Sequence, residues 1–356
     1  MNNRLKRCME RAEQGEELII GFFGGSITQG SLASSDQLCY AYRVFQWWEN
    51  QYPQAKFHYV NGGIGGTNSY FGASRVVSDL LMYNPDVVVV DFSVNDDETN
   101  TELFKETFEG LLRKILTWNT NPAVIVLNNV YYDTGRNMQT IHNQIAEYYQ
   151  VPYVSIKDTV YPKIQSGELE REALTPDNLH PNDLGHQLVA EEICRLLEQV
   201  REMDSQIEEL KEIPSPLVTD TFEFAKRLTI MNSSPQLDGF RADPREKLGH
   251  LDFFKNGWTG KKVGDRIRFE VEAANIAIQY RKTIHQPAPV AKLIIDGEEE
   301  KAILLDGNFD EDWGDCLYLQ SVLEHGEKRI HSVELEIVKA DKDLQSEFYL
   351  LSLILA

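Results

Sequence analysis

A serine at a glycine turn and a histidine with a nearby aspartate could together cleave an ester. Ser26 follows Gly25 at the end of a predicted strand, residues 19–24. A serine hydroxyl becomes a good nucleophile when a base removes its proton. His180 is the candidate base, because the carboxylate of Asp177, three residues earlier, can bond the imidazole Nδ1 and fix its tautomer. Taken alone, Ser26 is equally a helix cap and His180 an exposed loop residue.

A serine mechanism also needs hydrogen-bond donors for the oxyanion. The backbone N–H of Ser26 is one, and the side-chain amide of Asn95 is a second. The third is an N–H of the glycine loop 61–67, which lacks both the Lys-Ser/Thr of a P-loop and the G-x-G-x-x-G spacing. Because all three follow predicted strands, they can converge at one edge of a parallel sheet. The loop donor is expected to be Gly66, with two neighbouring glycines as alternatives, Gly63 and Gly65.

Strands alternate with helices through the first 200 or so residues, which predicts a parallel sheet covered on both faces. The run 87–92 begins with four consecutive valines, as expected of a central parallel strand buried on both faces. The helices are predicted at 38–52, 69–82, 102–118, 138–149 and 183–210, and the strands at 19–24, 57–61, 87–92, 123–128 and 152–156.

The pattern changes at Pro214-Ser215-Pro216, which is typical of a short, stiff linker. Short alternating strands dominate afterwards, with turns such as Asp296-Gly297. This pattern favours an antiparallel β-sandwich of jelly-roll type. The sequence therefore predicts an α/β domain over 1–213 and an accessory β domain over 214–356. The second-domain strands are expected at 266–271, 276–280, 291–295, 301–305, 317–319, 332–338 and 348–355.

Composition narrows the classes of partner. The 356-residue chain has a formal net charge of −21, which disfavours nucleic acid and anionic membrane surfaces and suits a neutral small-molecule or oligosaccharide ester. The four cysteines show no zinc-ligand spacing, so no metal and no organic cofactor is expected. The first fifteen residues lack the apolar run of a signal peptide, and a cytoplasmic location is the expectation. Oligomeric state is left open.

Four blocks in this order resemble the SGNH (GDSL-like) hydrolases. They are Gly24-Gly25-Ser26-Ile27-Thr28, the loop from Asn61 to Gly66, Val94-Asn95-Asp96, and Asp177-x-x-His180-Pro181. The resemblance covers the first 200 or so residues and implies a three-layer α/β/α, flavodoxin-like domain. It implies Ser26 as nucleophile, His180 as base with Asp177 as its partner, and Ser26, Gly66 and Asn95 as oxyanion donors. Gly25 stands where many members carry Asp, a form that resembles the carbohydrate acetylesterase branch.

The sequence thus favours a serine esterase that removes acetyl groups from carbohydrates. A longer-chain esterase or lysophospholipase of the same fold, and a non-catalytic glycan-binding protein, are the alternatives. Asp96 and its two acidic successors are expected to cap the next helix. Histidines such as His142 and His186 are expected to be surface or packed residues, Trp47 and Trp48 to lie in a core, and Trp258 and Trp313 to be core rather than sugar-stacking residues.

Overall fold

The structure, a computed structural model, describes residues 3–203 and 212–356. The chain forms two compact units, Met1–Phe224 and Ala225–Ala356. Within the described ranges, every helix is too short or too polar to cross a membrane.

The first unit is built on a parallel sheet with the strand order β2-β1-β3-β4-β5. This is the flavodoxin-like order, and it confirms the predicted fold class. Strand β1 lies between β2 and β3, so Phe22 pairs with Asn61 on one side and with Val89 on the other. The carboxyl ends of these strands therefore meet at one edge. The strands are β1 (Glu17–Gly24), β2 (Lys56–Asn61), β3 (Val87–Asp91), β4 (Ala123–Asn128) and β5 (Tyr153–Ser155).

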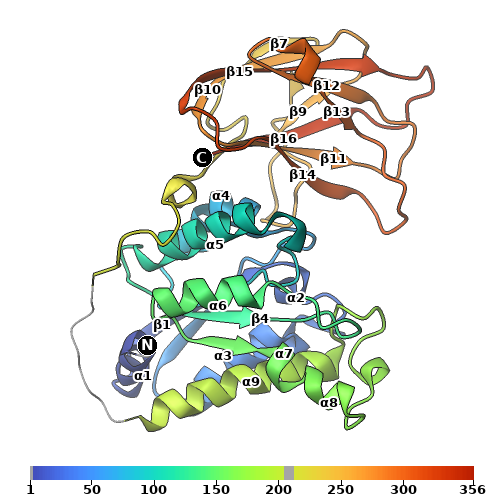
Figure 1. Cartoon of the computed structure of the whole chain (residues 1–356). Helices are drawn as coiled ribbons and strands as arrows, with labels where there is room; N and C mark the ends of the chain where they lie inside the picture. The colour runs from blue at the N-terminus through green and yellow to red at the C-terminus, as the bar shows by residue number, and fades with distance from the viewer. Residues whose placement is uncertain (1–2, 204–211) are drawn as a thin grey trace. The chain divides into compact units, whose positions relative to one another are not determined.

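Helices cover both faces of this sheet (Figure 1). Helices α1, α3 and α9 pack on one face, where Trp48 and Leu197 share a buried core with Leu18, Ile20 and Ile125 of the strands. Helices α4, α5 and α6 cover the other face. The helices are α1 (Asn3–Glu13), α2 (Ser26–Gln29), α3 (Tyr40–Gln51), α4 (Ser69–Asp79), α5 (Thr101–Leu116), α6 (Gln139–Tyr148), α7 (Ile156–Thr159), α8 (Tyr161–Gln165) and α9 (Asp183–Glu202).

Most predicted elements of this unit are present with small shifts at their ends. Helix α1 was not predicted, although Leu5 and Met9 on its inner face are buried. The predicted helix 183–210 is observed as α9 up to Glu202, and positions 204–211 lie outside the described residues. Trp47 and Trp48 are buried as expected.

The second unit is a β-sandwich of two antiparallel sheets in residues 225–356. One has the order β13-β12-β15-β10-β7, and the other β14-β11-β16-β9-β8, with β6 also paired to β16. Strand β10 alternates exposed and buried residues, and its inward side chains join Trp258 in the core. The strands are β6 (Lys226–Leu228), β7 (Gln236–Asp238), β8 (Arg241–Ala242), β9 (Trp258–Gly260), β10 (Arg266–Ala273), β11 (Ile276–Lys282), β12 (Val290–Ile295), β13 (Ile303–Asp306), β14 (Cys316–Leu323), β15 (Arg329–Lys339) and β16 (Phe348–Leu355).

Strands β6 to β9 were not predicted, because they are only two or three residues long. Trp258 is core, as expected, whereas Trp313 is 60% exposed and contacts Phe309, so the core expectation for Trp313 is wrong.

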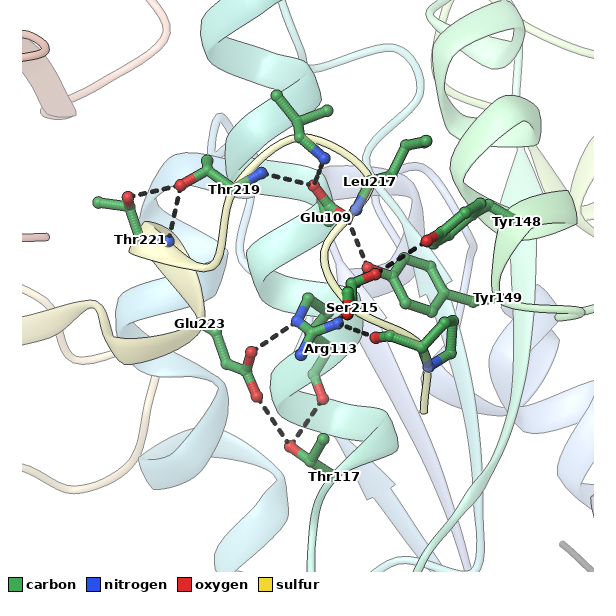
Figure 2. Close-up of polar contacts among 12 residues, drawn as sticks. Glu109, Arg113, Thr117, Tyr148, Tyr149, Ser215, Leu217, Thr219, Thr221 and Glu223 are labelled. Carbon is green, nitrogen blue, oxygen red and sulfur yellow. Dashed lines mark hydrogen bonds and ion pairs between the residues drawn. The ribbon is translucent and has the colours of Figure 1, made fainter. Parts of the chain in front are cut away.

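The segment 214–224 belongs to the first unit, although the sequence pattern groups it with the second domain. Figure 2 shows it lying along helix α5, where Glu109 accepts hydrogen bonds from its backbone. The Glu109 carboxylate accepts from the N–H groups of Leu217, Val218 and Thr219. Tyr149 donates its hydroxyl to the same carboxylate, at 2.5 Å. A buried carboxylate satisfied in this way fixes the segment in place.

An ion pair and a buried ring hold the far end of this segment. Arg113 Nε lies 2.6 Å from Glu223 Oε2 (Figure 2). The ring of Phe222 is fully buried and packs edge-on against Tyr70, 5.0 Å between centroids. A Cβ atom at Gly110 of α5 would collide with Phe222, so glycine is required there for the close approach. Two independent attachments therefore keep the segment on the α/β unit.

Candidate active site

Ser26 is the first residue of α2, at the point where β1 ends. Its two preceding glycines allow the sharp turn, and both positions are crowded. A Cβ at Gly24 would overlap the Thr28 hydroxyl oxygen and the carbonyl of Asp91, and one at Gly25 would overlap the side-chain oxygen of Asn95. The chain therefore needs glycine at both positions to bring Ser26 to this edge of the sheet.

Ser26, His180 and Asp177 form a continuous hydrogen-bonded chain. The Ser26 Oγ lies 2.8 Å from His180 Nε2, and His180 Nδ1 lies 2.7 Å from Asp177 Oδ2. The other carboxylate oxygen accepts from the backbone N–H of His180 at 2.8 Å and of Leu179 at 3.0 Å. The aspartate thus fixes both the ring and the backbone of the histidine. This leaves His180 Nε2 as the atom facing the serine hydroxyl.

The hydrogen bonds also set the charge of Asp177. Burial raises the pKa of Asp177, but the bonds from the His180 ring and from the N–H groups of His180 and Leu179 outweigh it, so the net pKa lies below its usual range. The carboxylate is therefore ionised at neutral pH and can stabilise a positive charge on the imidazole.

Helix α9 begins directly after this loop. It is capped by Asn182, whose side-chain oxygen accepts hydrogen bonds from Leu184 N and Gly185 N.

In the glycine loop after β2, the backbone donors of four successive residues are already in use. Gly62 N–H donates to Phe22 O, Gly63 N–H to Asn61 Oδ1, Ile64 N–H to Gly24 O, and Gly65 N–H to Gln29 Oε1. Among the described residues, none accepts a hydrogen bond from Gly66 N–H. Gly66 is exposed and has a φ of +69°, where glycine is favoured. Of the three glycines considered from sequence, Gly66 therefore has the backbone donor left for a ligand.

Asn95 lies beside the serine turn. It follows β3 in a tight turn, with its N–H donating to Phe92 O at 3.0 Å. Its amide packs against Gly25, the residue before Ser26, as the crowding at that glycine shows. A separate link ties the glycine loop to α2, where Asn61 Nδ2 donates to Thr28 O at 2.8 Å. The structure thus brings the regions of Ser26, Gly66 and Asn95 together at one sheet edge.

Beneath α2 lies a buried polar network around Asp91, the last residue of β3. Thr28 Oγ1 bonds the Tyr40 hydroxyl at 2.8 Å and donates to Asp91 Oδ2 at 3.4 Å, and Asn129 Nδ2 donates to Asp91 Oδ2 at 2.8 Å. Burial raises the pKa of Asp91 to about 7. The network anchors the short helix that begins with Ser26. Among the described residues, no group of three or more His, Cys, Asp or Glu side chains is placed to hold a metal ion.

Comparison with known proteins places this site in a family. Residues 22–188 match the GDSL-like lipase/acylhydrolase family. The chain is 47% identical to a solved two-domain esterase (CEX) active on acetylated mannans, with a TM-score of 0.97, covering 99% of this chain and 95% of the other. The chain belongs to the GDSL-like lipase/acylhydrolase family.

Two further relatives are also esterases by name. A two-domain esterase (CEX) co-crystallised with mannopentaose is 48% identical, with a TM-score of 0.94, over 99% of this chain and 94% of that one. An arylesterase from Vibrio mimicus is 22% identical over 209 residues, which cover 53% of this chain and 92% of the relative. This GDSL-like protein is accordingly a carboxylic ester hydrolase.

In the GDSL-like hydrolase, a buried arginine holds the serine turn and the glycine loop together. Arg75 of α4 is fully buried, and its guanidinium donates to Gly24 O at 3.0 Å and to Gly62 O at 2.6 Å. It also lies over the Phe23 ring, 4.2 Å from the centroid. Sequence reasoning missed Arg75. The available signal was a charged residue on a helix whose neighbours are small or apolar.

Two sequence expectations about other polar residues need correction or refinement. Asp96 does not cap the following helix, because it is buried and bonds Ser69 N and His142, while Asp97 is the residue that accepts from Thr99 N. His186 is a packed histidine, as expected, with its Nδ1 accepting from Tyr40 N. In both cases the partner lies far away in the chain, so local sequence spacing carried no signal.

Proposed function

We propose that this hydrolase is a serine esterase that removes acetyl groups from carbohydrates through an acyl-enzyme on Ser26. The observation that carries the proposal is the chain of short hydrogen bonds from Ser26 Oγ through the His180 ring to Asp177. The acetylated-mannan activity of a relative that shares 47% identity over 99% of this chain supports the carbohydrate acetyl ester as substrate. The crystallised mannopentaose complex of a similar esterase supports an oligosaccharide.

In the first half of the reaction, Ser26 Oγ attacks the acetyl carbonyl while His180 Nε2 takes the hydroxyl proton. The carbonyl oxygen becomes an oxyanion that accepts hydrogen bonds from the N–H groups of Ser26 and Gly66 and from the amide of Asn95. When the intermediate collapses, the C–O bond to the sugar breaks. His180 returns its proton to the leaving sugar oxygen, and an acetyl-serine ester is left.

In the second half, His180 takes a proton from water, and the resulting hydroxide attacks the acetyl-serine carbonyl. The same donors bind the second oxyanion. Collapse of this intermediate releases acetic acid, and the proton on His180 goes back to the Ser26 oxygen. Asp177 holds the ring and stabilises the imidazolium in both halves, and it keeps its negative charge throughout.

Acetate release from acetylated manno- and xylo-oligosaccharides tests the proposal, with Ser26→Ala as the diagnostic variant. Ser35→Ala is the matched control, because Ser35 precedes a short helix without a side-chain capping bond. Ser26→Ala should lower turnover by at least about 10⁴-fold, and Ser35→Ala should leave it unchanged. Turnover retained by Ser26→Ala would exclude the serine mechanism.

A series of p-nitrophenyl esters from acetate to octanoate separates the acyl-chain alternatives. An acetylesterase should lose rate steeply beyond short acyl groups, whereas a lysophospholipase-like enzyme should prefer the long ones. Binding of acetylated oligosaccharide without acetate release would instead support a non-catalytic glycan-binding protein.

A further inference from the structure

The oxyanion donors of the proposed mechanism lie on separate loops, so each loop needs a fixed place. We infer that Asp96 is a positioning residue that joins the loop carrying Gly66 to the loop carrying Asn95. The inference rests on the proposed function, because it concerns the same oxyanion site. Asp96 itself contacts neither the nucleophile nor the base.

The carboxylate of Asp96 makes the connection directly. Asp96 follows Asn95 in the chain, and both residues donate their N–H groups to Phe92 O at 3.0 Å, so they share one rigid turn. Asp96 Oδ1 accepts from the backbone N–H of Ser69 at 2.8 Å. Ser69 begins α4, three residues after Gly66. One buried side chain therefore spans the two loops.

His142 of α6 holds the second oxygen of the same carboxylate. His142 Nε2 lies 3.0 Å from Asp96 Oδ2, and both side chains are fully buried. The imidazole stacks on the ring of Phe108, with centroids 3.7 Å apart and planes at 6°. Among the described residues, His142 Nδ1 has no hydrogen-bond partner. An unpartnered buried N–H is costly, so the geometry favours a proton on Nε2, donated to Asp96, over one on Nδ1.

Replacement of Asp96 by asparagine keeps the side-chain volume but cannot keep both hydrogen bonds, the one from Ser69 N–H and the one with His142 Nε2. If the new amide nitrogen faces Ser69 N–H, two donors oppose each other and the Gly66 loop must move. If it faces His142, the ring must take the other tautomer, and its buried Nδ1 then carries a proton with no acceptor. Neither orientation preserves both bonds. The same asparagine would be harmless at a position that merely fills space.

The expected result is specific to the transition state. Because the oxyanion exists only there, displaced donors lower kcat more than they change KM. With p-nitrophenyl acetate and the full chain, Asp96→Asn should lower kcat by about 10- to 100-fold, the loss typical of a misplacement of about 1 Å, with KM within about twofold. Asp97→Asn is the matched control, because Asp97 is exposed and bonds only locally to Thr99 N. It should behave as the wild type.

A double-mutant cycle separates positioning from a general loss of structure. Asn95→Ala removes one of the donors that Asp96 is inferred to hold, so adding Asp96→Asn in that background should cost clearly less than it does in the wild type. His142→Phe is a second variant for the same cycle, since it keeps the ring on Phe108 and removes the donor to Asp96. It should lower kcat in the same direction, by less.

Unchanged kcat in Asp96→Asn, or a loss fully additive with Asn95→Ala, would overturn the inference. If Asp96→Asn does not fold, an unchanged or additive His142→Phe would do the same. Failure of the proposed function gives a different result, in which Ser26→Ala keeps its turnover or the wild type releases no acetate. In that case the inference falls with the mechanism.

Discussion

Replacement of Glu109 by glutamine should release the segment 214–224 from helix α5. Glu109 Oε2 accepts from Val218 N–H at 2.8 Å and Thr219 N–H at 3.1 Å, and Oε1 accepts from Leu217 N–H and the Tyr149 hydroxyl. Glutamine has one acceptor oxygen, so its NH₂ group must face one of these pairs. Facing Leu217 and Tyr149 is the better choice, because the hydroxyl can turn to accept, but Leu217 N–H is then left without an acceptor.

The size of the effect follows from these bonds. A buried donor without an acceptor costs about 1–3 kcal/mol, and the two remaining N–H bonds each lose about 1 kcal/mol when their acceptor becomes neutral. The segment should therefore be held less tightly by about 3–5 kcal/mol. At about 1.4 kcal/mol per factor of ten, hydrogen exchange of its amides should accelerate by about 10²- to 4 × 10³-fold.

Hydrogen exchange followed by mass spectrometry on peptides covering 214–224 measures this opening directly. A local readout is preferable, because a chain of two units need not unfold in one step. Glu102→Gln is the control, since Glu102 is exposed on the same helix. Exchange of Leu217, Val218 and Thr219 that stays at the wild-type rate in Glu109→Gln would refute the role assigned to the carboxylate.

Three further outcomes are expected. Asn95→Ala should lower kcat for acetyl esters by about 10²- to 10³-fold with little change in KM, as measured by steady-state kinetics. A change in KM as large as the change in kcat would argue against an oxyanion role. Asp177→Asn should lower kcat by about 10²- to 10⁴-fold, because the His180 ring loses the partner that fixes its tautomer, and a wild-type rate would contradict that role. Burial lowers the pKa of His186 from its ordinary 6.5 to about 4, so the unfolded chain binds a proton in this pH range that the folded chain does not, and stability should fall as pH drops from about 6.5 to about 4. The melting temperature of His186→Gln should fall less steeply over that window, and parallel curves would contradict this account.

The fold class could be read from the chain because its signals are local. Alternating strand and helix patterns predict a layered α/β unit, and the Val87–Asp91 run is buried throughout, as a central parallel strand should be. The β-sandwich followed from short alternating strands such as β10. Strands of two or three residues, such as β8, were not predicted, because so few residues show no measurable periodicity.

Some residues of the candidate site could likewise be identified from local sequence, and others only from the structure. Asp177 and His180 lie within one turn of chain, so their spacing allowed the bond that the structure contains. Asn95 and Ser26 were identifiable because each follows a strand in a recognisable motif. Gly66 could be distinguished from Gly63 and Gly65 only when the acceptors of the neighbouring N–H groups were known.

By itself, the sequence determined which residue types meet at the edge of a parallel sheet. It also indicated that these residues suit an ester substrate. Both could be predicted because the strand pattern, the turn residues and the nucleophile motif each depend on a short stretch of chain. Only the tertiary structure decided what holds those residues in place. Arg75, Asp96 and Glu109 are ordinary charged residues in the chain, and each became a fixed contact because folding removed its charge from water beside partners distant in sequence. A buried charge requires such partners, and no local pattern can specify where they come from.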